Sequence, residues 1–100
     1  MKFVNAKKKE IIPSYKIGFI LEVELSGKIS FDGLLNIIYH DFGIPYKIIA
    51  ANIEFIAEKS FGNVQLFLET EKEKHENLEF YLNRQRILHV SVEKISRKAV

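Results

Sequence analysis

The side chains that most often carry acid–base or metal chemistry are few and scattered in this sequence. The chain has three histidines, His40, His75 and His89, and no cysteine. A catalytic histidine acts on a nucleophile or substrate held beside it, and zinc needs several ligands at matched spacings. No histidine here has an obvious nucleophile beside it, and no His-x-x-x-His spacing occurs. We therefore expect surface or marginal histidines and no metal site.

The sequence also lacks the pattern of a nucleotide-hydrolysing site. A Gly-rich loop that ends in lysine would hold ATP through its backbone amides, and no such run is present. The absence of cysteine removes thiol nucleophiles and thiolate ligands as well. We expect that this chain is not an enzyme and that it uses no cofactor.

Two groups of outward-facing residues give weak indications of other functions, namely acid–base catalysis and RNA binding. Glu22 and Glu24 share one face of a predicted strand, as an acid–base pair would, but such neighbours on an open sheet are more often a solvated surface. Phe67 is the single aromatic residue predicted on the outer face of the central strands, where an RNA-binding sheet stacks bases. Glutamates surround Phe67 and would repel phosphate, so we expect no nucleic-acid partner.

Residue periodicity predicts the elements that carry these side chains. Residues 16–26 alternate between apolar and polar side chains, which is typical of a half-buried strand. Residues 31–42 have apolar side chains at helical spacing, with Ser30 or Asp32 as the cap and Gly43 as the stop. The expected core residues are Ile17, Phe19, Leu21, Val23 and Leu25 in the strand, and Phe31, Leu34, Leu35, Ile38 and Phe42 in the helix.

The longest predicted strand, residues 45–57, is partly apolar on both faces. Simple alternation places Ile49, Ala51, Ile53 and Phe55 on one face, and Ile48, Ala50, Asn52, Glu54 and Ile56 on the other. Pro45 has no N–H to offer a neighbouring strand, so it fits the start of an edge strand. Residues 59–62 are predicted to form the following hairpin turn, with Gly62 at positive φ.

The remaining chain is predicted as strand 63–70, helix 71–86 and strand 88–95. The residues of these strands expected in the core are Val64, Leu66, Leu68, Leu88, Val90 and Val92. The residues expected on the outer sheet face are Glu22, Glu24, Gln65, Phe67, Glu69, His89, Ser91 and Glu93. Phe80 lies away from the apolar stripe of the second helix, so we expect it to point outward.

This order of elements, βαββαβ, predicts the fold class. Right-handed crossovers make the second half interleave with the first. We expect an α+β protein of the ferredoxin-like (ACT-like) fold, in which a four-stranded antiparallel sheet of order 4-1-3-2 carries both helices on one face. The second and fourth strands then lie at the edges of the sheet.

Length and charge indicate the domain limits. The chain has 100 residues and a net charge of +2, with +3 in residues 1–14, +3 in residues 94–100 and −4 between them. We expect one domain at residues 15–96, a basic linker at 1–14 and a basic tail at 97–100. No run of about 18 apolar residues occurs, so no membrane-spanning helix is predicted.

The predicted edge strand offers a surface for a second copy of the chain. An unpaired strand edge is either protected or used for pairing, and two edges that meet across a twofold axis make a homodimer. The expected dimer-interface residues are Tyr46, Ile48, Ala50, Ala51 and Asn52. The crease beside this contact is suited to a small ligand, with backbone groups for its charged ends and Ile48, Ile49 or Ile53 for an apolar side chain.

Several short stretches occur in a characteristic order over about 80 residues. They are Leu25-Ser26-Gly27, Leu34-Leu35, Phe42-Gly43-Ile44, Ile48-Ile49, Asn52-Ile53-Glu54-Phe55-Ile56, Phe61-Gly62, Tyr81-Leu82 and the Val-x-Val-Glu of Val90 to Glu93. In this pattern residues 17–95 resemble the NIL domain, the C-terminal regulatory module of the ATP-binding subunit of bacterial methionine-import ABC transporters.

The resemblance implies a sensor of a small molecule. Domains of this family dimerise, bind methionine near the dimer contact and thereby hold the transporter inactive, which is a coupling between two sites. The implied partners are an amino-acid ligand, a parent ATPase domain joined through residues 1–14, and a membrane permease. The implied location is cytoplasmic, at the inner face of the membrane. The expected ligand-binding residues are Ile44, Lys47, Ile48, Ile49, Asn52 and Ile53.

Lys47 is a departure from the family pattern. The family is named for an Asn-Ile-Leu motif, and the corresponding residues here are Lys47, Ile48 and Ile49. A lysine can meet the carboxylate of a ligand but has no acceptor for its ammonium group. Methionine, another amino acid and no ligand at all therefore stay open. The alternative function is a ligand-free dimerisation or structural module of the same or another protein.

Overall fold

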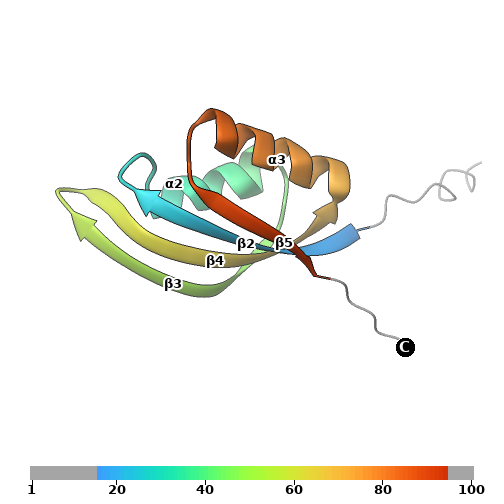
Figure 1. Cartoon of the computed structure of the whole chain (residues 1–100), viewed down its shortest axis with the longest axis horizontal. Helices are drawn as coiled ribbons and strands as arrows, with labels where there is room; N and C mark the ends of the chain where they lie inside the picture. Colours follow the sequence, from blue (N-terminus) through green and yellow to red (C-terminus); the bar gives the residue numbers. More distant parts are fainter. Residues whose placement is uncertain (1–15, 95–100) are drawn as a thin grey trace, which may run out of the picture.

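The computed structural model describes residues 16–94 and shows a four-stranded antiparallel sheet with the helices on one of its faces (Figure 1). The elements in chain order are β2 (Lys16–Ser26), α2 (Phe31–Asn36), the π-helical turn η1 (Ile37–Asp41), β3 (Tyr46–Ile56), β4 (Lys59–Glu71), α3 (Lys72–Arg84) and β5 (His89–Lys94). The strand order β3-β4-β2-β5 confirms the predicted ferredoxin-like topology, with the second and fourth strands at the edges. The predicted linker at 1–14 and the tail at 97–100 lie outside the described residues.

The core lies between the sheet and the helices, and β2 is its centre. Every second residue of β2 from Phe19 to Leu25 is buried, as the alternation predicts. Their neighbours on β4 are Val64, Leu66 and Leu68, which are also buried. The helices contribute Leu34, Ile38, Leu78 and Leu82 to the same cluster. Full burial of each such side chain stabilises the fold by roughly 1.5–3 kcal/mol.

The first helical segment begins at a defined cap and widens in its last turn. Ser30 caps α2, because its hydroxyl accepts a hydrogen bond of 2.9 Å from the backbone N–H of Gly33. The amide of Phe42 reaches back to the carbonyl of Ile37 at 3.1 Å, which is the i→i+5 spacing of a π-turn. The predicted helix at 31–42 is therefore present, but its second half is wider than an α-helix.

The predicted position of the hairpin turn is wrong by two residues. Ala57 and Glu58 form the two-residue turn between β3 and β4, with φ of 54° and 66°. Residues 59–62 already belong to β4, because the ladder continues through the pair Ile56–Lys59. Gly62 does have positive φ, 134°, but inside the strand. A Cβ at Gly62 would collide with the carbonyl oxygen of Asn52, so glycine is needed for close strand approach and not for the turn.

The predicted core face of the last strand is also wrong. Leu88, Val90 and Val92 are 64%, 62% and 57% exposed. The register pairs Val90 with Glu22 and Val92 with Ile20, which places both valines on the open face of the sheet. Periodicity alone fixes which residues of a strand share a face, but not which of the two faces is covered.

His89, Ser91 and Glu93 accordingly lie on the helix side, and their predicted place on the outer face is wrong as well. They pair with Val23, Leu21 and Phe19 of β2, which point to the core. The physical reason is a polar contact from α3, where His75 is hydrogen-bonded to the hydroxyl of Ser91. Phe80, on the far side of α3, is 63% exposed and confirms the predicted outward position.

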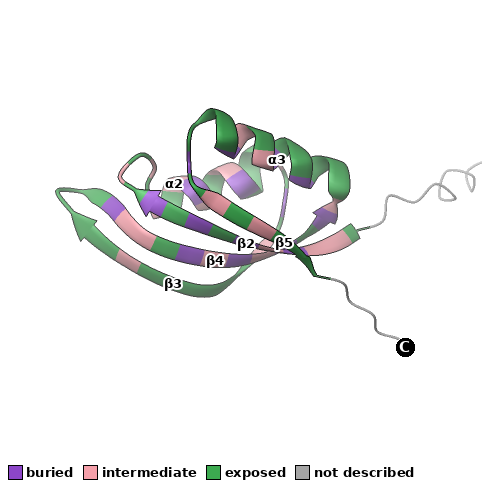
Figure 2. Cartoon of the chain, in the orientation of Figure 1, coloured by how far each residue is buried: buried purple, intermediate pink, exposed green. Residues whose placement is uncertain are grey.

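The strands of the sheet differ in how far their residues are buried. Figure 2 shows β3 exposed along most of its length, whereas β2 and β4 alternate between buried and exposed residues. The helices cover the middle of the sheet, so its far face and its β3 edge are open to solvent. Among residues 16–94, no helix has the length and apolar character needed to cross a membrane.

Candidate functional site

Strand β3 is the most exposed element of the sheet. It pairs with β4 along one edge, and no other strand of residues 16–94 pairs with its second edge. Within β3 only Tyr46 and Ile53 are partly buried. The exposed large apolar side chains on β3 are Ile48, Ile49, Phe55 and Ile56. An exposed apolar edge of this length favours pairing with another chain.

A β-bulge at Ile49 divides β3 into two halves. Ile48 pairs with Leu66 and Ala50 pairs with Gln65, so Ile49 has no partner in the ladder. The extra residue reverses the alternation between the two halves. The simple alternation predicted for residues 45–57 is therefore wrong at the bulge. On the helix side are Tyr46, Ile48, Ala51, Ile53 and Phe55, and on the open side are Lys47, Ala50, Asn52, Glu54 and Ile56.

The structure places the predicted ligand-binding residues in three different environments. Ile44 is fully buried in the core and has no surface to offer a ligand in this chain. Ile48 and Ile53 lie on the helix side, and Ile49 is the bulged residue. The two remaining residues, Lys47 and Asn52, share the open face.

The predicted interface residues lie along the free edge but on both faces. Tyr46 is half-buried, and its ring packs edge-on against that of Tyr39 at 6.5 Å. Ala50 and Ala51 are exposed at the middle of the strand and point to opposite faces. These two small side chains leave the backbone of β3 accessible from either side, which is what a pairing edge requires.

A shallow hollow of about 310 Å³ lies on the open face beside these alanines. Its lining residues are Glu22, Ala50, Ala51, Asn52, Asn63, Val64 and Gln65. Three amides and one carboxylate meet here because the register pairs Asn52 with Asn63 and Glu22 with Gln65. Amides donate and accept hydrogen bonds, so the group can contact both an ammonium and a carboxylate.

Glu22, Asn63 and Gln65 were not among the predicted ligand contacts. The signal that could have found them is their position: they are outward residues of the two central strands, next to an edge strand whose middle residues are alanines. The sequence predicted the outward direction of Glu22 and Gln65 correctly, but it did not give the register that brings them together.

His75 has surroundings that the sequence did not predict. It is only 3% exposed, and its ring stacks on Phe19 with centroids 3.6 Å apart and an interplanar angle of 4°. Its Nε2 lies 2.6 Å from Ser91 Oγ and 3.7 Å from a carboxylate oxygen of Glu79. Burial lowers the pKa of His75, while the nearby Glu79 carboxylate acts in the opposite direction. The expectation of a marginal histidine is therefore wrong for His75.

The His75–Ser91 pair has the spacing of a base and a nucleophile but not their setting. Nδ1 of His75 is buried and has no hydrogen-bond partner among residues 16–94, so no third group of this part of the chain orients the ring for catalysis. Its ring lies beneath α3 against Phe19, where a substrate has no access. The pair is best understood as a polar contact that joins α3 to β5.

Metal ligation has no candidate in the described part of the chain. Within residues 16–94, no three or more histidine, cysteine, aspartate or glutamate side chains lie close enough together to hold an ion. The described structure therefore offers two kinds of surface for function: the β3 edge and the open face of the sheet.

These features define a class: a small ferredoxin-like domain with a covered face, an open face and one long free edge. The model of the NIL domain family matches residues 20–94, so the chain belongs to the NIL domain family. No curated protein matches the chain.

A solved structure shares the fold. It is the C-terminal domain of an ABC transporter ATP-binding protein from Enterococcus faecalis. The two chains superpose with a TM-score of 0.64 at 18% sequence identity, over 90% of this chain and 97% of the other. At this identity the likeness concerns the fold alone.

Proposed function

We propose that this chain is the regulatory domain of the ATP-binding subunit of an ABC importer. In this proposal it senses methionine or a related amino acid and mediates feedback inhibition of transport by the substrate. The observation that carries the proposal is the family match over residues 20–94, which covers every strand and helix except the start of β2. The fold shared with the Enterococcus faecalis domain supports the same context.

The proposal includes a homodimer formed through β3. The free edge, the exposed apolar side chains and the two central alanines support this choice of surface. Because the bulge at Ile49 interrupts the regular ladder, we place the pairing between residues 50 and 56. Two copies joined in this way would form one continuous eight-stranded sheet.

The remaining parts of the proposal follow from the transporter context. The partners would be the parent ATPase domain and the membrane permease, and the location would be cytoplasmic at the inner face of the membrane. The chain itself would bind ligand without catalysing a reaction. Ligand binding at the domain would change the equilibrium between active and inactive transporter by its differential affinity for the two states.

Calorimetric titration of the 100-residue chain with L-methionine tests the sensing function. We expect saturable heat and a rise in melting temperature, because a ligand that binds only the folded state stabilises it by mass action. L-alanine is the matched control, since it has both charged groups but little apolar side chain. The absence of both heat and thermal shift at millimolar methionine would contradict sensing by this domain.

The competing function is a dimerisation module without ligand. The observation that favours it is Lys47, which stands where the family motif has asparagine and which does not line the hollow beside the two alanines. If this function is correct, the dimer forms with the same affinity in the presence and absence of each amino acid tested.

A further inference from the structure

A group of exposed apolar side chains lies on the open face of the sheet, beside the edge opposite to β3. Leu88, just before β5, and Val90 and Val92 within it are exposed, and Val92 pairs with Ile20 of β2. Ile20 in turn pairs with Phe67 of β4, so the group extends over three strands. Single exposed apolar residues are ordinary, whereas a contiguous group indicates a contact surface. We call this group the apolar patch; it consists of Ile20, Phe67, Leu88, Val90 and Val92.

Two carboxylates border the apolar patch on β2. Glu22 pairs with Val90, and the backbone N–H of Glu24 donates a hydrogen bond of 2.9 Å to the carbonyl of Leu88. Within residues 16–94, neither carboxylate forms an ion pair. A shallow hollow of about 300 Å³ lies here, and its lining residues are Glu22, Glu24, Asn63, Leu88, His89 and Val90. Along β2, the open face is therefore apolar first and acidic next.

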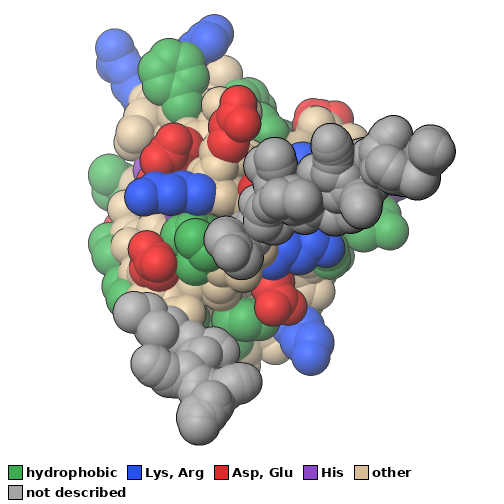
Figure 3. All heavy atoms as spheres, turned by 90° about the vertical axis from the view of Figure 1, so that its right-hand side faces the viewer, with side chains coloured by type: hydrophobic (Ala, Val, Ile, Leu, Met, Phe, Trp, Pro, Cys, Tyr) green, Lys and Arg blue, Asp and Glu red, His purple; other side chains and the backbone are tan. Residues whose placement is uncertain are grey.

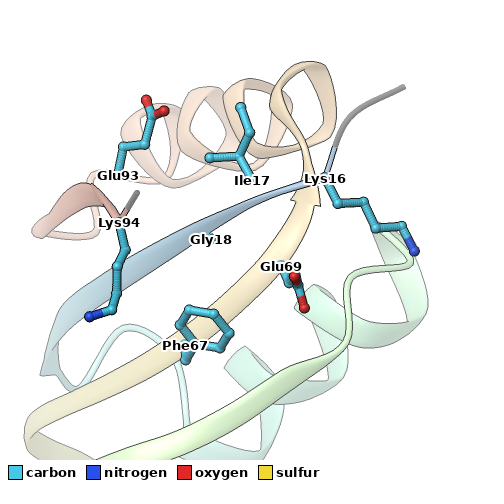
Figure 4. A pocket seen from close by; sticks show the side chains of 7 residues that line it. All are labelled: Lys16, Ile17, Gly18, Phe67, Glu69, Glu93 and Lys94. Carbon is cyan, nitrogen blue, oxygen red and sulfur yellow. The ribbon is translucent and has the colours of Figure 1, made fainter. Parts of the chain in front are cut away.

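The open face is also hollowed at the end of the sheet where β2 begins. In Figure 3, which views the molecule from this end, hydrophobic, basic and acidic side chains lie interspersed. A Cβ at Gly18 would lie 3.0 Å from Cε1 and Cζ of Phe67, so the backbone of β2 has no side chain of its own beside the apolar patch. A hollow of about 340 Å³ lies here, and Figure 4 shows Phe67, Glu69 and Lys94 at its border, directed away from α3. The open face thus has room for a chain segment that passes over Gly18 toward Glu24.

The sequence before Lys16 has side chains that are complementary to this face. Residues 1–14 carry a net charge of +3, whereas the carboxylates beside the apolar patch are negative. Counted back from Lys16, the sequence has Ile12 and Ile11 first, and lysines at residues 9, 8 and 7 next. The order is therefore apolar first and basic next. It matches the order of apolar and acidic side chains that the open face presents along β2 from the same starting point.

The segment is long enough to cover the apolar patch. Lys7 is nine residues from Lys16, and an extended chain of that length spans at most about 30 Å. Glu24 is eight residues from Lys16 along β2, which is roughly 26 Å at about 3.3 Å per residue. The lysines can therefore reach both carboxylates while the two isoleucines lie over the apolar patch.

We propose that the apolar patch is the docking surface for residues 1–14 of the same chain. Ile11 and Ile12 cover the apolar side chains, and the lysines at residues 7–9 pair with the two carboxylates. The apolar contact supplies most of the binding free energy, because exposed ion pairs contribute little. The charges fix the direction in which the segment lies.

The contact would act on the connection between two domains. Residues 1–14 are the connection that we expect to a parent ATPase domain, so docking would shorten this connection and hold that domain near one end of the sheet. Release of the segment would lengthen the connection without any change in the fold of the domain. The inference goes beyond the proposed sensing and does not depend on it, since no amino-acid ligand takes part in the contact.

Paramagnetic NMR of the ¹⁵N-labelled 100-residue chain tests the contact. The chain has no cysteine, so Ala6→Cys gives a single site for a nitroxide label. We expect loss of the amide signals of Leu88, Val90 and Glu24, because an unpaired electron broadens the resonances of nearby residues. Reduction of the nitroxide should restore these signals. The amides at the start of α3, on the other face and at the other end of the sheet, should keep their intensity.

Ile11→Ser with Ile12→Ser tests the apolar part of the contact. This double variant should restore the signals of Leu88 and Val90 in the presence of the label. Phe80→Ser is the matched control, since it removes an exposed apolar side chain from the far side of α3 and should leave the broadening unchanged. Restoration by Phe80→Ser to the same extent would contradict a contact on the apolar patch.

Glu22→Gln with Glu24→Gln tests the charged part of the contact. This double variant should weaken the broadening at Leu88. Glu73→Gln with Glu76→Gln removes two exposed carboxylates from α3 and should leave the broadening unchanged. Equal weakening by both pairs would assign the attraction to the net charge of the domain and would overturn the proposed contact.

Two further outcomes would overturn the inference. Broadening confined to residues next to Lys16, such as Gly18 and Lys94, would show that residues 1–14 do not reach the apolar patch. Equal broadening of a ¹⁵N-labelled chain by a nitroxide on a separate ¹⁴N copy would assign the apolar patch to a second copy. Neither outcome bears on methionine binding, which the calorimetric titration tests separately.

Discussion

At the scale of single residues, His75 combines burial with incomplete hydrogen bonding. Nε2 contacts Ser91, and Nδ1 has no hydrogen-bond partner within the described part of the chain. Desolvation lowers the pKa of His75 most strongly, and His89 lowers it further. The carboxylates of Glu79, Glu76 and Glu93 raise it but do not reverse the direction. These titratable groups belong to α3 and β5, while Phe19 of β2 covers one face of the ring. Protonation of His75 therefore affects the contact between α3 and the sheet.

The lowered pKa predicts a loss of stability in weak acid. The folded state disfavours the proton, so the unfolded chain binds more protons once the pH falls below the unfolded pKa of about 6.5. The free energy of unfolding should therefore decrease as the pH falls from 6.5 through the lower folded pKa. Urea unfolding at pH of about 7.5 and about 5.5 measures this.

His75→Gln is the matched variant for this prediction, since glutamine is neutral at both pH values and can still contact Ser91. We expect a smaller loss of stability between the two pH values in the variant than in the native chain. An equal loss in both proteins would assign the pH dependence to the carboxylates and not to His75.

Gly62 is the residue whose replacement we expect to damage the sheet most directly. An added Cβ meets the carbonyl oxygen of Asn52 on the neighbouring strand, and φ of 134° is a strained backbone for any other residue. Gly62→Ala should lower the free energy of unfolding by about 1–3 kcal/mol or more. Asn63→Ala, an exposed neighbour on the same strand, should change it by no more than about 0.5 kcal/mol. Similar values for the two variants in urea unfolding would argue against this clash.

At the scale of elements, the sequence predicted the topology and the central core, for a physical reason. The apolar residues of β2 and β4 alternate without interruption, and a covered central strand permits only one register of such a pattern. The edge strands are less constrained. In β5 the two apolar residues, Val90 and Val92, face solvent while Ser91 contacts His75, and this orientation depends on a contact between distant elements.

The β3–β4 hairpin shows two further limits of prediction from sequence. The bulge at Ile49 has no local signal in a run of apolar residues, yet it moves Lys47 to the face that carries Asn52. The turn uses Ala57 and Glu58 in place of the glycine and asparagine that positive φ normally selects. Simple alternation therefore places Lys47 and Asn52 on opposite faces of the strand, whereas the structure places them on the same face.

The turn residues allow a prediction of increased stability. Both Ala57 and Glu58 have left-handed φ, which costs an L-residue roughly 1–2 kcal/mol. The double change Ala57→Asn and Glu58→Gly supplies the preferred pair for such a turn and should raise the free energy of unfolding by about 1 kcal/mol. Glu58→Gln removes the same charge without relieving the backbone, so it should have little effect. Thermal unfolding distinguishes the two, and equal melting temperatures would show that the turn is not strained.

At the scale of the whole molecule, the two parts of the proposed function use neighbouring parts of one sheet. The proposed dimer uses the edge of β3 that no other strand of residues 16–94 pairs with, and the hollow beside Ala50 and Ala51 lies on the open face next to that edge. A ligand in this hollow would contact the strand that we propose for the dimer, so ligand binding and dimerisation would be coupled.

The proposed dimer predicts that a charge introduced in the middle of β3 prevents dimerisation. The small side chains of Ala50 and Ala51 leave the backbone of β3 accessible, so a long charged side chain at residue 50 would obstruct the approach of the second strand in both copies. Ala50→Lys should therefore convert the dimer to a monomer in light scattering at concentrations where the native chain is dimeric. Val90→Lys adds the same charge to an exposed position on the opposite edge strand and should leave the dimer intact. Dissociation by Val90→Lys but not by Ala50→Lys would place the interface on β5. A native chain that is monomeric at every concentration would remove the dimer from the proposal, while a ligand site within one copy would still be open to titration.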